Sequence, residues 1–201
     1  MKVCYVLPQC SNDSAENFFH IINFLEKLGK NVELYIIIEH GDAMVRIHSA
    51  KQIIILDDGE NSKTHISRVM MLLRIYFELY NKGVKIFFAR ASLTGVLPLI
   101  IANRILNFNR AKIIFWSCGI DVIPLSYFPN KKNCKRIFSK MIVRFVFKGI
   151  NYLATGPEKM VNYYHKNFRI PKNKIVTLYN DISLKRFFPL SVLEKNRLKG
   201  E

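Results

Sequence analysis

The chain has 201 residues, and half of them are hydrophobic, which is enough for one globular domain with a core and excludes a disordered protein. Its formal net charge of +16 favours anionic partners, namely anionic lipid or phosphorylated small molecules. Nucleic acid is not expected, because no RRM, KH or helix-turn-helix pattern accompanies the charge. The four cysteines lack CxxC spacing and the five histidines do not cluster with them, so we expect reduced thiols and no metal site.

Seven short β-rich runs recur along the chain, and several are apolar on consecutive positions, as in "IFFA" and "IIFW". Strands that are buried on both faces have this composition, which favours a parallel sheet covered by helices. The predicted strands are Lys2–Leu7, Asn31–Ile38, Gln52–Leu56, Val84–Ala89, Lys112–Ser117, Asn151–Thr155 and Lys174–Leu178.

Segments with helical periodicity separate most of these runs. The alternation predicts right-handed βαβ units and a single Rossmann-like, doubly wound α/β domain with a mostly parallel sheet of about seven strands. The link between the second and third runs is too short for a helix, so we expect a local deviation there. We expect this domain to occupy residues 1–189, and residues 190–201 to be a tail or the start of an interdomain linker. The predicted helices are Ser14–Gly29, Thr64–Asn81, Gly95–Leu106, Cys134–Lys148 and Glu158–Phe168.

Ligands of such a sheet bind where strands reach its C-terminal edge, which selects the loops after Leu7, Ala89, Ser117 and Thr155. The first loop, "PQCSNDSAEN", contains no glycine, and the sequence has no GxxxxGK[ST] motif. A nicotinamide dehydrogenase is therefore disfavoured, and a P-loop enzyme is excluded.

The first loop has two interpretations. Asp13 and Glu16 have the spacing of a helix capping box. Alternatively, Ser11, Asn12 and Ser14 offer hydroxyl and amide groups to a sugar.

In the second loop, "FFARASLTG", Arg90 stands at the end of a buried strand and is followed by Ser92 and a helix. The start of a helix favours anions. Arg90 is therefore a candidate for binding an anion or an acceptor, with a local ion pair as the alternative.

The third loop, "FWSCGID", contains Gly119, which allows a sharp turn or close approach of a ligand. Asp121 either lines a binding site, pairs with a nearby basic residue or caps a turn. Cys118 has no base near it in the sequence, so a buried structural thiol is favoured over a nucleophile.

No acidic residue occurs between Val122 and Pro157, and basic residues alternate there with apolar ones at helical spacing. Such a helix either lies on an anionic membrane or packs into the domain with a solvated basic face. No apolar run approaches the roughly 18 residues of a membrane span, so we expect a cytoplasmic protein that is soluble or peripheral on the inner face of the membrane. The predicted membrane-facing residues are Lys131, Lys132, Lys135, Arg136, Lys140 and Arg144.

Three motifs, in this order, resemble the N-terminal domain of family 4 glycosyltransferases with the GT-B architecture, from Met1 to about Pro189. "FFARASLTG" is similar to the family's "HARSPLAG" helix start, and "FWSCGIDV" is similar to its "HG.D" or "WG.D" loop. The stretch from Ile150 to Pro189 is similar to the part of the family that leads to "NGVD…F.P". The residues in register are Arg90, Ser92, Gly95, Gly119, Asp121, Asn180, Phe187 and Pro189.

The resemblance implies the acceptor-binding half of a retaining glycosyltransferase, which transfers sugar from a nucleotide-sugar to a polysaccharide or glycolipid acceptor without a metal. The nucleotide-sugar donor would bind mainly to a second domain or subunit, so we expect this chain alone to be inactive. The implied acceptor or cleft residues are Ser11, Asn12, Ser14, Arg90, Ser92, Cys118, Gly119 and Asp121, and the implied hinge residues are Asn180, Phe187 and Pro189.

The chain departs from the family pattern at Asp13 and Ser14, which stand where the family has two glycines, and at Asp181, which replaces a hinge glycine. Cys118 stands where His or Trp is common, so no catalytic residue is carried over. The alternative function is a non-catalytic basic Rossmann-like module that binds an anionic membrane surface or a partner enzyme.

Overall fold

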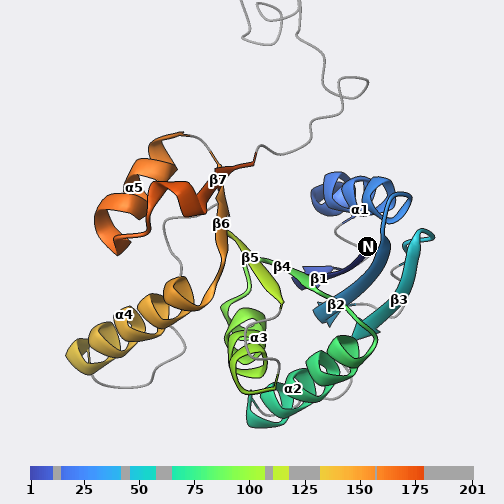
Figure 1. The fold of residues 1–201 in the computed structure, drawn as a ribbon, viewed down its shortest axis with the longest axis horizontal. Coiled ribbons are helices and arrows are strands. Elements are labelled where there is room, and N and C mark those ends of the chain that lie inside the picture. The colour runs from blue at the N-terminus through green and yellow to red at the C-terminus, as the bar shows by residue number, and fades with distance from the viewer. Residues whose placement is uncertain are drawn as a thin grey trace, which may run out of the picture.

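A computed structural model describes residues 1–10, 15–41, 46–57, 65–106, 111–117, 132–156 and 158–178. They form one seven-stranded sheet with the strand order β3-β2-β1-β4-β5-β6-β7 (Figure 1). Every neighbouring pair is parallel, which confirms the predicted α/β Rossmann-like fold. The strands are β1 (Lys2–Cys10), β2 (Glu33–Gly41), β3 (Ala50–Ile55), β4 (Ile86–Arg90), β5 (Lys112–Ser117), β6 (Tyr152–Thr155) and β7 (Ile175–Thr177).

Within the described residues, five α-helices connect the strands, and each overlaps one of the five predicted helices. Between β2 and β3, the described residues 46–49 contain no helix, and β3 pairs with β2 through a register irregularity at Leu34 and Tyr35. The short link thus joins two parallel neighbours. The helices are α1 (Ala15–Gly29), α2 (His65–Asn81), α3 (Leu93–Leu106), α4 (Lys132–Gly149) and α5 (Glu158–Phe168).

The sheet separates two apolar clusters because side chains alternate along each strand. Tyr5 and Leu7 of β1 pack with Leu25 of α1 on one face. Cys4 and Val6 belong to the larger cluster on the opposite face, which includes residues of α2, α3, α4 and α5. In Figure 1, α1 accordingly lies on one side of β1 and β2, while α2 and α3 lie on the other. The sheet is therefore covered on both faces at β1 and β2.

Two of the cysteines, Cys4 and Cys10, lie in β1, and both are buried free thiols, as the sequence predicts for them. Burial raises the pKa of both thiols above its ordinary value. Among the described residues, no helix has the length and apolar character to cross a bilayer.

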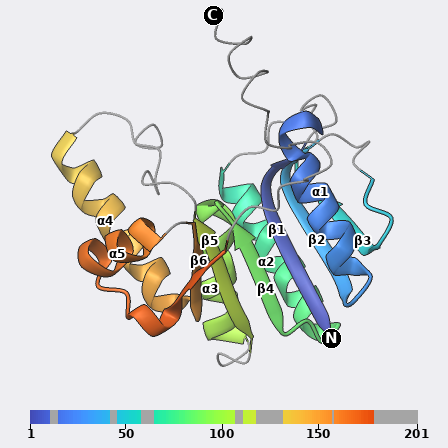
Figure 2. The same ribbon diagram turned by 90° about the horizontal axis from the view of Figure 1, so that it is seen from above.

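The strands run in one direction, so their C-terminal ends meet at a single edge of the sheet (Figure 2). From β1 the chain adds β2 and β3 on one side of the sheet, and it then returns to add β4 on the other side of β1. The strands β1 and β4 are therefore neighbours in space, although β2 and β3 separate them in the sequence. In Rossmann-like folds such a switch point is where ligands bind. The C-terminal ends of β1 and β4, flanked by those of β2 and β5, thus mark the position at which a site is expected.

Candidate functional site

A buried carboxylate stands near the end of β2. Glu39 is 1% exposed, and its two oxygens accept hydrogen bonds from the hydroxyls of Ser92, directly before α3, and of Thr94 in the first turn of α3. Burial raises the pKa of Glu39, although the hydroxyl hydrogen bonds and the nearby charges of His40 and Arg68 act in the opposite direction. The Glu39 carboxyl group therefore links β2 to the start of α3 through hydrogen bonds. Its raised pKa means that it stays protonated to a higher pH than an ordinary carboxyl group.

Ser92 also caps α3. Its hydroxyl oxygen accepts a hydrogen bond from the backbone N–H of Gly95 at 2.8 Å, as an N-cap residue does. The carbonyl of Gly95 accepts a hydrogen bond of 2.9 Å from the hydroxyl of Tyr76 in α2. The first turn of α3 is thus held from two directions, by β2 and by α2.

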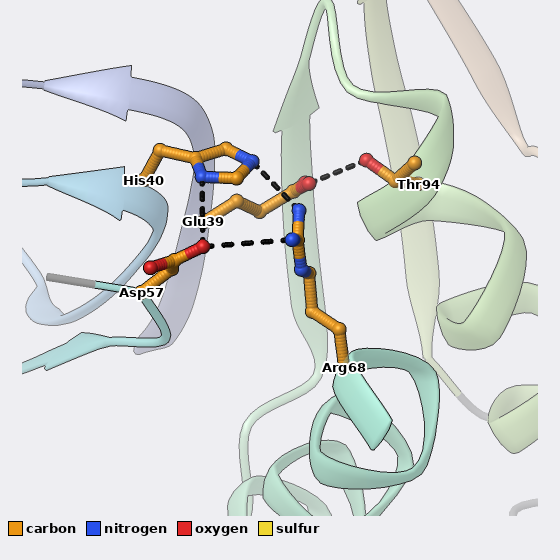
Figure 3. A network of polar contacts seen from close by, with 5 residues as sticks. All are labelled: Glu39, His40, Asp57, Arg68 and Thr94. Carbon is orange, nitrogen blue, oxygen red and sulfur yellow. Dashed lines mark hydrogen bonds and ion pairs between the residues drawn. The ribbon is translucent and has the colours of Figure 1, made fainter. Parts of the chain in front are cut away.

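A second polar group adjoins this turn (Figure 3). His40 Nε2 lies 2.7 Å from a guanidinium nitrogen of Arg68, and His40 Nδ1 lies 3.3 Å from a carboxylate oxygen of Asp57. Because a guanidinium group only donates hydrogen bonds, Nε2 is the acceptor and the ring proton is on Nδ1, where it points to Asp57. We refer to Glu39, His40, Asp57, Arg68, Ser92 and Thr94 together as the edge network.

The members of the edge network differ in their access to solvent. The side chains of Asp57 and Arg68 are 9% and 11% exposed, and a second Arg68 nitrogen lies 3.5 Å from the Asp57 carboxylate. The His40 side chain is 46% exposed. His40 is therefore the member that a solute can reach, and Asp57 and Arg68 fix the orientation of its ring.

Arg90, the last residue of β4, lies against the neighbouring strand. Its guanidinium carbon is 4.2 Å from the ring centre of Trp116 in β5, the residue that is paired with Arg90 in the sheet. Trp116 is 4% exposed, and its indole N–H has no hydrogen-bond partner among the residues that the structure describes. A half-buried cation and a buried N–H donor thus lie together at the edge of the sheet.

Ala91 separates Arg90 from Ser92 and has a left-handed backbone, with φ of 48°. Its N–H donates a hydrogen bond of 2.7 Å to the carbonyl of Trp116. The turn sends the two neighbouring side chains to different places, Arg90 onto the ring of Trp116 and Ser92 to Glu39. Strained residues of this kind are frequent at functional sites.

A group of buried hydroxyls lies at the ends of β5 and β6. The hydroxyls of Ser117 and Tyr164 are 2.7 Å apart, and the hydroxyl of Thr155 donates a hydrogen bond of 3.0 Å to the carbonyl of Ser117. All three residues are buried. These hydroxyls hold α5 against the sheet edge and do not face solvent.

Of the predicted cleft residues, the structure describes Arg90 and Ser92. Both stand at the C-terminal edge, as predicted, but Ser92 is 2% exposed and its hydroxyl is engaged with Glu39 and Gly95. Arg144 is exposed on α4, where the structure does not describe the side chains of Lys132, Lys135, Arg136 and Lys140. Outside the described residues lie Ser11, Asn12, Ser14, Cys118, Gly119, Asp121, Lys131, Asn180, Phe187 and Pro189.

The sequence interpretation did not include Glu39, His40, Asp57 or Arg68. The available signal was the pair Glu39-His40 directly after the apolar run "YIII", together with Asp57 after "IIIL". Acidic residues that end two neighbouring buried strands are brought to one edge of a parallel sheet. Applying the edge rule to the second and third strands as well would have selected Glu39, His40 and Asp57, but not Arg68, which lies in α2.

The sequence has no match among protein-family models or among curated proteins. Solved structures with a similar fold include the UDP-GlcNAc 2-epimerase of Methanocaldococcus jannaschii, with a TM-score of 0.54 and 18% identity over 90% of this chain. Anabaena Alr3699/HepE in complex with UDP and glucose has a TM-score of 0.60 and 9% identity over the whole chain. A glycosyltransferase from Rickettsia africae has a TM-score of 0.54 and 15% identity over 99% of the chain.

The alignments cover 46%, 49% and 48% of these three structures, so this chain spans just under half of their length. At these identities the likeness concerns the fold, which the epimerases and the glycosyltransferase-like proteins share. The chain therefore has a Rossmann-like fold that it shares with about half of each of these structures.

Proposed function

We propose that this chain is the acceptor-binding half of a retaining glycosyltransferase. The enzyme would transfer sugar from a nucleotide-sugar to a polysaccharide or glycolipid acceptor, and a second domain or subunit would bind the donor. The names of the similar structures support a nucleotide-sugar substrate, since they include UDP-GlcNAc 2-epimerases, a complex with UDP and glucose, and a glycosyltransferase.

The observation that carries the proposal is the position of Arg90. It ends β4 at the switch point of the sheet, it lies 4.2 Å from the ring of Trp116, and the α3 helix starts three residues later. Stacking on an aromatic ring orients a guanidinium group, and the planar guanidinium has the geometry that matches a planar or tetrahedral anion. The phosphate or carboxylate of an acidic acceptor suits such a group.

The edge network supplies rigidity to this site. Glu39, Ser92 and Tyr76 hold the first turn of α3, which directly follows Arg90. Precise positioning is the main contribution that an acceptor-side domain makes to sugar transfer, because it presents the attacking hydroxyl to a donor that is bound elsewhere. We assign Arg90 and the half-exposed His40 as the residues that meet the acceptor.

Trp116 provides a direct test of anion binding, because it is the only tryptophan and Arg90 covers its ring. Titration with inorganic phosphate and with glucose 1-phosphate should give a saturable change in tryptophan fluorescence. Arg90→Lys should weaken this change and Arg90→Ala should abolish it. Arg104→Ala removes another arginine that lies over an aromatic ring, that of Phe145, and should leave the change intact. An Arg90→Ala protein that responds like the wild type would contradict the assignment.

Sugar transfer is tested separately. The purified 201-residue chain should transfer no sugar from a panel of nucleotide-sugars to lipid or polysaccharide acceptors. Transfer should appear when a donor-binding domain or subunit is supplied, and Arg90→Ala should reduce it. Robust transfer by the chain alone would refute the half-enzyme proposal. Conversion of the nucleotide-sugar into its epimer, without transfer, would assign the epimerase reaction instead.

A further inference from the structure

Three large apolar side chains are exposed at the C-terminal end of α3 and in α4. Ile105 is 68% exposed, Met141 62% and Phe145 38%. Met141 and Phe145 are four residues apart, so they stand on the same side of α4, one turn from each other. These side chains are not required by the core, because Val143, Val146 and Phe147 already form the inward face of α4.

The ends of the two helices lie against each other. The guanidinium carbon of Arg104 is 5.1 Å from the ring centre of Phe145, and a methyl group placed on Gly149 would lie 2.5 Å from the Ile100 side chain. Arg104 and Ile105 therefore adjoin the exposed side of α4, and the N-terminal part of α4 extends away from the sheet (Figures 1 and 2). We call Arg104, Ile105, Met141, Arg144, Phe145 and Lys148 the α3–α4 surface.

The charge of the α3–α4 surface has one sign. Arg104, Arg144 and Lys148 are exposed among the apolar residues. Neither α3 nor α4 contains an Asp or Glu, and the sequence has none between Glu78 and Asp121 or between Asp121 and Glu158. In α4, basic residues recur every fourth position at 136, 140, 144 and 148.

Exposed apolar residues on α2 provide a contrast. Met70 and Phe77 are 62% and 47% exposed, but between them Arg74 pairs with Glu78 at 3.3 Å. The α2 surface therefore carries compensated charge, whereas the α3–α4 surface carries positive charge without acidic neighbours on its own helices. Apolar side chains flanked by basic residues without acidic neighbours on the same helices match the interface of an anionic bilayer. There the apolar groups enter between the headgroups, and the cations pair with the anionic headgroups.

We propose that the α3–α4 surface docks on an anionic lipid bilayer as a peripheral contact. This goes beyond sugar transfer, because the surface uses other residues than Arg90, Trp116 and the edge network. It also extends the predicted membrane contact from the basic residues of α4 to Arg104, Ile105, Met141 and Phe145. Met141 and Phe145 insert, and Arg104, Arg144 and Lys148 hold the headgroups.

The test is co-sedimentation of the 201-residue chain with vesicles of phosphatidylcholine alone and with vesicles that contain phosphatidylglycerol. We expect binding to the anionic vesicles that decreases with salt. Met141→Ser with Phe145→Ser, and separately Arg144→Gln with Lys148→Gln, should each lower the partition coefficient at least fivefold. The matched controls are Met70→Ser with Phe77→Ser, and Lys172→Gln with Lys174→Gln, two exposed lysines elsewhere. Each should change it less than twofold, and thermal unfolding confirms that every variant folds.

Four results would overturn the proposal. The first is absence of binding to anionic vesicles, and the second is equal binding to neutral ones. The third is an equal loss in the control variants, which would mean that binding does not depend on the α3–α4 surface. The fourth is binding that survives both pairs of α4 substitutions. A dimer that is lost in Met141→Ser with Phe145→Ser, without vesicle binding, would assign the surface to a second copy of the chain instead. None of these results bears on the fluorescence test at Trp116.

Discussion

Glu39 and Ser92 are 53 residues apart in the sequence, and the hydroxyl of Ser92 donates a hydrogen bond to the Glu39 carboxylate. Since Ser92 also caps α3, this contact connects the end of β2 to the start of the helix that follows Arg90. The geometry of the candidate anion site therefore depends on a buried acid that does not reach solvent.

The first prediction concerns the pH dependence of stability. Burial raises the pKa of Glu39 in the folded protein, so folding favours the protonated acid. The contribution of Glu39 is then fully present below the ordinary carboxyl pKa of about 4.3 and is lost as pH rises through the raised value. We expect the free energy of unfolding of the wild type, relative to Glu39→Gln, to fall by an amount of order 1 kcal/mol between pH 4 and pH 8. Urea unfolding across this pH range measures it.

Glu26 provides a control for which stability should change with pH in the opposite direction. Desolvation acts to raise its pKa, but hydrogen bonds from Ser49 and from the backbone of His48 and Ser49 outweigh it, and the pKa is lowered. The wild type should therefore gain stability relative to Glu26→Gln as pH rises through the acid range. A flat or rising difference for Glu39→Gln would contradict the first prediction.

The second prediction compares two tyrosines of α2, the buried Tyr76 and the partly buried Tyr80. The hydroxyl of Tyr76 donates a hydrogen bond to the carbonyl of Gly95, whereas the buried hydroxyl of Tyr80 has no hydrogen-bond partner within the described part of the chain. We expect Tyr76→Phe to lower the free energy of unfolding by about 1 kcal/mol, and Tyr80→Phe to leave it unchanged or raise it. Thermal and urea unfolding of both variants decide the question. Equal costs would show that the Gly95 contact contributes nothing.

The third prediction concerns close packing at Gly95. A methyl group there would lie 2.6 Å from Glu39 Oε1, 2.8 Å from Ser92 Oγ and 2.9 Å from a Val6 methyl group. Gly95→Ala should therefore destabilise the fold by about 1–3 kcal/mol and weaken the fluorescence response of Trp116. Gly156→Ala is the matched control, because nothing lies within 4 Å of its added methyl group. It should change stability by less than about 1 kcal/mol.

The fourth prediction distinguishes the two contacts of Asp57 in the edge network, one with Arg68 and one with His40. Asp57→Ala removes the carboxylate beside the mostly buried guanidinium of Arg68, which should cost about 3 kcal/mol of stability. His40→Ala should cost less than about 1 kcal/mol, because its side chain is 46% exposed. A double-mutant cycle of Asp57→Ala with Arg68→Ala measures the coupling between the pair. Additive costs would mean that the ion pair does not stabilise the fold.

The fold follows from local patterns in the sequence. Apolar runs such as that of β5, Lys112–Ser117, have the length and composition of buried strands, and the periodic segments between them have the pattern of helices. The strand β2 shows the limit of this approach. Its apolar run ends at Ile38, but the strand continues to Gly41, so Glu39 and His40 are strand residues. A charged side chain in a buried strand is explained by its partners, and those lie far away in the sequence.

The candidate site was therefore predictable in position but not in its contacts. The sequence places Arg90 at the end of β4 and names an anion or an ion pair as its partner. In the structure its aromatic partner is Trp116, because the register of β4 with β5 places Trp116 directly opposite Arg90. Register is a property of the assembled sheet, and no single segment encodes it.

The left-handed turn at Ala91 makes two neighbouring side chains dependent on each other. Arg90 faces Trp116 and Ser92 faces Glu39 only while the residue between them keeps φ near 48°, a conformation that costs L-residues about 1 kcal/mol or more. We therefore expect a ligand bound at Arg90 and the protonation of Glu39 to affect each other through the turn at Ala91. One peptide turn thereby couples the surface of this edge to its interior.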